Sequence, residues 1–123
     1  MKILLAILTL TISTPVFADG PYDGIWFSSD MGYYSVYENN GTVFIVNLSP
    51  HNKMKETIQG TRNGNTIQAQ SIEGASLVKG VTKITMTSNT TFTAIQESCE
   101  RIYHEHYCLH PDGFTFYGQK IQG

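Results

Sequence analysis

Two cysteines and three histidines gather in one short segment near the end of the chain. The segment Ser98–Gly113 reads SCERIYHEHYCLHPDG and holds Cys99 and Cys108, the two cysteines of the sequence. In an oxidising compartment, two cysteines at this spacing favour one disulfide. The alternative is a pair of thiolates that bind metal or carry out redox chemistry, but the spacing departs from Cys-x-x-Cys. We therefore expect a Cys99–Cys108 disulfide.

Within this segment a histidine or cysteine recurs at every second position, at His104, His106, Cys108 and His110. On an extended strand these side chains share one face. Three imidazoles at this spacing can bind copper or zinc in an open site. A disulfide removes Cys108 from that ligand set, so we expect a solvated or structural loop without a cofactor. A zinc or copper site on His104, His106 and His110 remains the alternative.

The start of the chain has the pattern of a secretory signal peptide. Lys2 supplies the positive charge, residues 3–12 form an apolar run, and Ala18 is a small residue suited to cleavage. The apolar run is about half of the roughly 20 residues that a membrane-spanning helix needs. The sequence therefore predicts a signal peptide at 1–18 and one domain at 19–123. We expect this domain in the periplasm or outside the cell, and not as an integral membrane protein.

The composition excludes several classes of protein. The chain has 123 residues, of which 41% are hydrophobic and 15% charged, with a net charge of −2. This length suits one domain, and the composition is unlike that of disordered chains. A negative chain has no basic field to attract nucleic acid. Because no nucleophile elbow, phosphate-binding loop, dinucleotide fingerprint or marked catalytic spacing occurs, we expect no enzyme activity.

The domain contains short runs rich in threonine, aromatic and β-branched residues, separated by turn residues. The runs are Tyr22–Ser28, Gly32–Glu38, Thr42–Leu48, Lys55–Thr61, Asn65–Glu73, Val81–Thr87, Thr90–Glu97 and Phe114–Lys120. Short connections such as Asn39-Asn40-Gly41 join antiparallel neighbours, since parallel strands need longer crossovers. The sequence therefore predicts an all-β fold, a small antiparallel up-and-down barrel of about eight strands. The alternative is a two-sheet β-sandwich.

The third run is apolar on both faces. Residues 43–46 read Val-Phe-Ile-Val, so one face can fill the interior while the other must be covered. The cover can be a loop, a terminus or a partner. We expect one of the protein's own loops.

The first run carries Gly24-Ile25-Trp26, which resembles the Gly-x-Trp signature on the first strand of lipocalins and the related avidins, the calycins. The resemblance implies that Trp26 plugs one end of a barrel and packs against a basic side chain on a late strand, here Lys120. It also implies that Gly24 allows a close approach of two chain segments. Lipocalins are longer and usually carry a helix after the last strand, and avidins line a biotin site with several tryptophans. The resemblance therefore implies a barrel with a small cavity, but no retinoid, haem or biotin site. In overall character the chain also looks like small exported β-domains of bacteria.

These observations predict an exported, non-enzymatic binding protein for a small molecule or a surface ligand. We expect Trp26, Tyr33, Tyr37 and Lys120 to line or plug the interior, and the 99–108 loop to frame one end. One alternative is a protein-interaction module such as an enzyme inhibitor, which inserts a preorganised loop. The other is a metal-binding protein that uses the histidine-rich segment 99–110. A cavity on the barrel axis favours ligand binding, whereas a packed core with a protruding loop favours the inhibitor.

Overall fold

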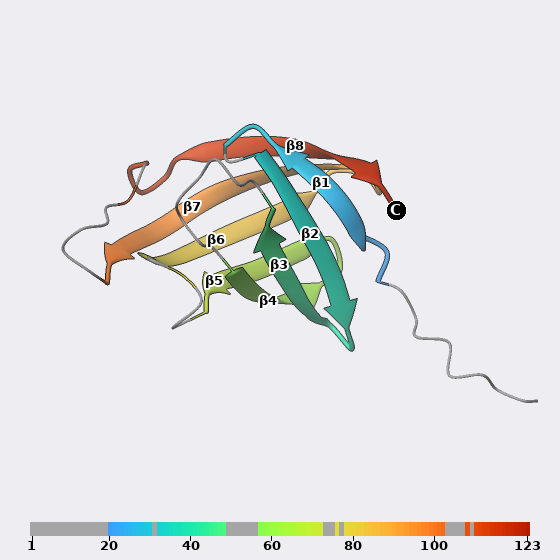
Figure 1. The fold of residues 1–123 in the computed structure, drawn as a ribbon, viewed down its shortest axis with the longest axis horizontal. Helices are drawn as coiled ribbons and strands as arrows, with labels where there is room; N and C mark the ends of the chain where they lie inside the picture. The colour runs from blue at the N-terminus through green and yellow to red at the C-terminus, as the bar shows by residue number, and fades with distance from the viewer. Residues whose placement is uncertain are drawn as a thin grey trace, which may run out of the picture.

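The computed structural model describes residues 20–30, 32–48, 57–72, 76, 78–102, 108 and 110–123. It has eight strands, each paired antiparallel with the next, and the first also pairs with the last to close a barrel (Figure 1). The strands are β1 (Gly24–Ser28), β2 (Gly32–Asn39), β3 (Thr42–Asn47), β4 (Thr57–Asn63), β5 (Thr66–Ser71), β6 (Val78–Met86), β7 (Thr91–Arg101) and β8 (Thr115–Gln122).

The all-β, up-and-down barrel predicted from the sequence is therefore confirmed, and the two-sheet sandwich is wrong because one continuous sheet closes on itself. The expected signal peptide at 1–18 lies outside the described residues. The described part of the chain has no helix with the length and apolarity that a membrane crossing requires.

The turn residues act as their chemistry predicts. Asn40 and Gly41 both have positive φ, 50° and 82°, which is the geometry of a type I′ hairpin turn between β2 and β3. The largest difference from the predicted strands is at the end of β7, which continues to Arg101 instead of stopping at Glu97. The extension forms because residues 98–101 pair with residues 78–81 of β6. Cys99 consequently lies on a strand and not in a loop.

The barrel has two unlike ends. The tight turns β2–β3, β4–β5 and β6–β7 lie at one end, together with the segment that enters β1 and the end of β8, and we call this the closed end. The connections β1–β2, β3–β4, β5–β6 and β7–β8 lie at the other end, which we call the mouth. The two longest strands, β6 and β7, pair along their whole length, and their paired ends extend toward the mouth (Figure 1).

Alternate residues of each strand point into the barrel, as a period of two requires. The core consists of Trp26, Tyr34, Val43, Ile45, Ile58, Ile67, Ala69, Ile84, Met86 and Ala94. Two register shifts interrupt the ladders, one between Ile25 and Trp26 where β1 meets β8, and one between Val81 and Thr82 on β6. Such bulges bend strands and help a sheet to close.

Gly24 lies where β1 pairs with β8, and substitution of this glycine tests how closely the two strands approach. It has a φ of +140°, and a Cβ built there would lie 2.2 Å from the Gln122 carbonyl oxygen, whereas a Cβ at Gly41 meets nothing within 4 Å. We expect Gly41→Ala to lower the free energy of unfolding by about 1 kcal/mol through backbone strain alone. Gly24→Ala should cost at least about 2 kcal/mol more, because β1 and β8 must also separate. Urea unfolding measures both, and equal losses would contradict the close approach.

Candidate functional site: a cavity inside the barrel

Side chains leave part of the barrel interior unfilled. A cavity of about 90 Å³ runs between the walls. An eight-stranded barrel has room either for its own side chains or for one small ligand, and this interior lies between the two cases. An engineered cavity of about 150 Å³ is enough to bind benzene, and the space here is about three-fifths as large, so a single ring fits only if it also reaches toward the mouth.

One wall of the cavity is aliphatic and the other aromatic. The aliphatic residues are Val36, Ile45, Ile58, Ile67, Val78, Ile84 and Met86. On the other wall, ring contacts form a column that runs from the closed end to the mouth. Trp26 lies 5.7 Å from Phe92, Phe92 lies 6.2 Å from Phe116, and Phe116 lies 6.4 Å from Phe114. The last ring, Phe114, stacks on His110 with centroids 3.8 Å apart. An apolar molecule would therefore meet mostly apolar atoms along both walls.

Trp26 forms the floor of the cavity. It is 2% exposed, and its indole N–H donates to the Tyr22 carbonyl oxygen at 2.8 Å. Its register partner on β8 is Lys120, whose Nζ lies 5.9 Å from the indole ring centroid. A cation at this distance from an indole face is favourable. This is the contact that the resemblance to calycins implies for these two residues.

Below the floor, an ion pair fills the closed end. Glu38, 7% exposed, accepts a short hydrogen bond from Nε of Arg62. The same arginine donates to the Gly64 carbonyl oxygen at 2.9 Å, and its guanidinium carbon lies 5.9 Å from the Tyr22 ring centroid. Its hydrogen bond with Glu38 raises the pKa of Arg62 above its ordinary value. The backbone N–H of Glu38 donates to Asp23 at 2.8 Å, so the network also ties the chain entry to β2.

At the mouth, a histidine meets a carboxylate. Nε2 of His110 makes a short contact with Oδ1 of Asp30, whose side chain is largely buried. The backbone N–H of Asp30 in turn donates to Oγ of Ser28 at 3.2 Å. All three residues line the cavity, so the mouth brings a carboxylate and an imidazole to a largely apolar interior.

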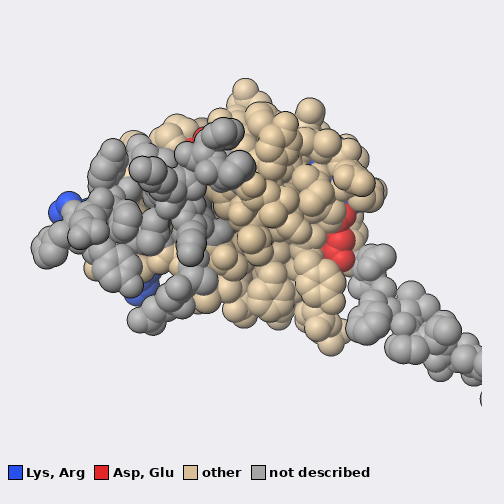
Figure 2. Space-filling view, viewed as in Figure 1, with Lys and Arg blue, Asp and Glu red and all other residues tan. Residues whose placement is uncertain are grey.

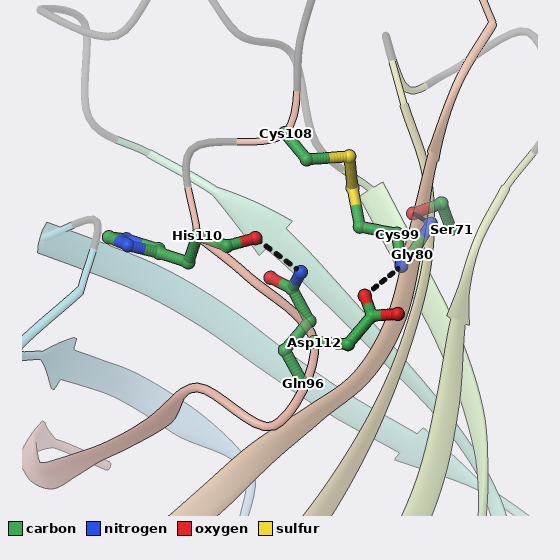
Figure 3. Close-up of a disulfide and its surroundings, with 7 residues drawn as sticks. All are labelled: Ser71, Gly80, Gln96, Cys99, Cys108, His110 and Asp112. Carbon is green, nitrogen blue, oxygen red and sulfur yellow. Dashed lines mark hydrogen bonds between the residues drawn. A yellow bond between two sulfur atoms is a disulfide. The ribbon is translucent and has the colours of Figure 1, made fainter.

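The polypeptide around His110 is fixed from several sides (Figure 3). A disulfide joins Cys99 on β7 to Cys108, with Cα atoms 6.1 Å apart. Gln96 donates from its side chain to the His110 carbonyl oxygen at 3.2 Å, and Asp112 accepts from the Cys99 backbone N–H at 3.2 Å. Figure 3 shows the imidazole pointing away from the disulfide. The predicted disulfide therefore helps to hold the histidine over the mouth.

The structure corrects part of the predicted site. Tyr33 and Tyr37, expected to line the interior, are 49% and 45% exposed on the outer face, and Tyr34 points inward instead. The reason is the choice of which alternate residues of β2 face inward, and this choice is set by the pairing of β2 with β1 and β3. Tyr34 pairs with Trp26 on β1, and residues directly opposite each other in a ladder share a face, so Tyr34 turns inward with Trp26.

The predicted metal ligands His104 and His106 lie outside the described residues. Of the other candidates, His110 contacts Asp30 and Cys108 is in the disulfide. Within the described ranges, no group of three or more His, Cys, Asp or Glu side chains is placed to hold a metal ion.

Sequence reasoning missed several residues of the site, namely Ser28, Asp30, Tyr34, Glu38, Arg62 and Gln96. Alternation along β2 could have revealed Glu38, because it shares a face with Tyr34 and Val36. A charged residue on the buried face of a strand needs a partner, and this signal points to a basic residue across the barrel. Asp30 had no comparable signal, because its partner His110 is 80 residues away.

Comparison with protein-family models, with curated proteins and with solved structures gives no match for this chain.

The ion pair at the closed end gives a stability prediction. Glu38→Leu leaves the Arg62 charge without its partner and should lower the free energy of unfolding by about 2 kcal/mol, less than a fully buried pair because the arginine reaches water. Glu38→Leu combined with Arg62→Leu should recover most of that loss, since apolar side chains can replace a buried pair. A double variant no more stable than the single one in urea unfolding would show that the charge pair is not the cause.

The disulfide gives a second prediction. Replacing Cys99 and Cys108 by serine opens a short loop and should lower the free energy of unfolding by about 2–3 kcal/mol. The indole signal of Trp26 should stay in place, because the tryptophan lies toward the closed end. Urea unfolding and proton–nitrogen NMR check both points. Unchanged unfolding of the original protein in a strong reductant would contradict the role given to this bridge.

Proposed function

We propose that this chain is an exported, non-enzymatic binding protein that holds one small molecule inside its barrel. The observation that carries the proposal is the cavity of about 90 Å³ between the aliphatic and aromatic walls. Ligand sites typically combine an apolar lining with a few placed polar groups. The interior of this barrel has both, and the carboxylate and the imidazole of its lining lie at the mouth.

The ligand has a compact apolar body and one polar group. Its body occupies the space between Phe92 and Ile45, above Trp26. Its polar group faces Asp30 and His110. Because Asp30 is a hydrogen-bond acceptor when ionised, a ligand that donates a hydrogen bond fits this end best.

The cavity also favours ligand binding over the enzyme inhibitor that the sequence left as an alternative. An inhibitor that acts through a rigid protruding loop needs no axial cavity, so the cavity favours ligand binding. Export is supported by the signal-peptide pattern of residues 1–18 and by the Cys99–Cys108 disulfide, which is typical of oxidising compartments. The resemblance of Gly24-Ile25-Trp26 to calycins adds support, since small calycin barrels bind ligands in their interior.

Toluene and phenol form a matched pair for testing this proposal. Both place the same ring in the cavity, but only phenol donates a hydrogen bond. We expect both to shift the Trp26 indole signal in NMR titrations of the full folded domain. Phenol should bind about tenfold more tightly, as a hydrogen bond to a charged acceptor is worth about 1.5 kcal/mol or more. Asp30→Asn should reduce that preference and leave toluene binding nearly unchanged.

Substitution of one isoleucine inside the barrel and of another outside it tests where toluene binds. Ile84→Phe fills the cavity and should abolish binding of toluene, whereas Ile95→Phe adds the same volume on the outer face, where the side chain is 37% exposed, and should not. Binding that survives Ile84→Phe would place the molecule outside the barrel. Absence of any shift with either molecule at millimolar concentration would overturn the proposed interior site.

A further inference from the structure

The outer surface of the barrel is charged on one side and uncharged on the other. Strands β8, β1, β2 and β3 are neighbours in the sheet, and they contain two charged residues, Glu38 and Lys120. Both face the interior, where Glu38 pairs with Arg62 and Lys120 approaches Trp26. Figure 2 views the molecule from this side and shows few Lys, Arg, Asp or Glu atoms over β1, β2 and β3. We call this outer surface of the four strands the uncharged face.

Large apolar and aromatic side chains stand on the uncharged face. They are Phe27, Tyr33, Tyr37, Val46, Leu48, Tyr117 and Ile121, with exposed fractions from 39% to 68%. Phe27 and Tyr33 are register partners and make an edge-to-face contact with centroids 5.4 Å apart. With roughly 200 Å² for each aromatic side chain and somewhat less for each aliphatic one, the group exposes roughly 600 Å². A patch of this size is at the upper end of what a monomer exposes and is often functional.

The other side of the barrel is different. The outer positions of β6 and β7 include Lys79, Lys83, Glu97 and Glu100. Charged residues are depleted from the centres of protein interfaces, and tyrosine and phenylalanine are enriched there. The uncharged face therefore has the composition of an interface, and the face formed by β6 and β7 does not.

We propose that the uncharged face binds a second copy of this chain in a two-fold symmetric dimer. In a two-fold symmetric contact, a charge close to the axis faces the same charge of the other copy, which is unfavourable. Contact through the uncharged face places no like charges opposite each other. The exposed area of roughly 600 Å² reaches the lower end of the range for a standard interface, which buries roughly 800 Å² per partner. Each of the four strands of this face pairs with a neighbour on both sides, so association through this face must use side chains.

This proposal answers a question that the sequence raises. The outer face of β3 was expected to be covered by one of the protein's own loops, yet Val46 is 40% exposed to solvent among the described residues. A partner copy would cover it. Binding inside the barrel and pairing through the outer face are independent, since they use opposite faces of the same strands.

Sedimentation equilibrium over a range of concentrations tests the dimer. The sample is the chain recovered after export, with its intact mass determined so that the form measured is known. We expect a concentration-dependent dimer in the original protein. Tyr33→Glu combined with Tyr37→Glu places four carboxylates at a two-fold contact and should weaken the dimer at least 100-fold. Ile95→Glu puts one carboxylate on the exposed outer face of β7 in each copy and should leave the dimer intact.

Circular dichroism in the near ultraviolet verifies that each variant folds, and Tyr37→Ser serves as a milder substitution if the double variant does not. A monomer at every concentration up to about 1 mM would overturn the proposal, because the affinity would then be no better than about 4 kcal/mol. Undiminished dimerisation of a folded double variant would also overturn it. Monomers that sediment with phosphatidylcholine vesicles would show instead that the face meets a lipid surface.

Discussion

The pairing of the first strand with the last is the constraint on which the rest of the structure depends. It fixes the number of strands around the interior at eight and therefore the space that side chains must fill. The two segments approach closely at the seam. A Cβ at Gly118 of β8 would lie 2.2 Å from the Phe27 carbonyl oxygen and 2.4 Å from the Phe92 ring. Glycine at this position therefore lets the sheet close and leaves room for one of the aromatic rings that line the cavity.

The two ends of the closed barrel differ in where their polar groups find partners. At the closed end, Trp26, Glu38 and Arg62 satisfy one another or nearby carbonyl groups, so the polar atoms have partners within the protein. At the mouth, Asp30 and His110 line the cavity itself. Burial of a polar group is favourable only when it has a partner, so a molecule that enters deeply gains most if its own polar atom stays at the mouth. In the proposed binding function, this difference between the ends would orient a bound molecule.

The sequence predicts the strands and the disulfide well, and the site only in part. Strand number and turns follow from local chemistry, as the positive φ of Asn40 and Gly41 shows. The Cys99–Cys108 bridge follows because the chain has two cysteines. The inward face of β2 does not follow, because Tyr33 and Tyr34 are adjacent and a shift of one residue exchanges the faces. The contact between Asp30 and His110 joins residues 80 positions apart, and closure of the barrel brings them together.

The alternation of β2 side chains between the two faces of the sheet, which was predicted incorrectly from the sequence, also separates the inner surface of the barrel from its outer surface. Its residues alternate between Tyr34 and Glu38 inside and Tyr33 and Tyr37 outside. The inner set meets the cavity and the ion pair, while the outer set belongs to the uncharged face. Because neighbouring residues on a strand point in opposite directions, a substitution in the inner set does not directly contact the side chains of the outer set, and the reverse also holds. A small closed barrel can therefore hold a ligand inside and associate through its outside with the same few strands.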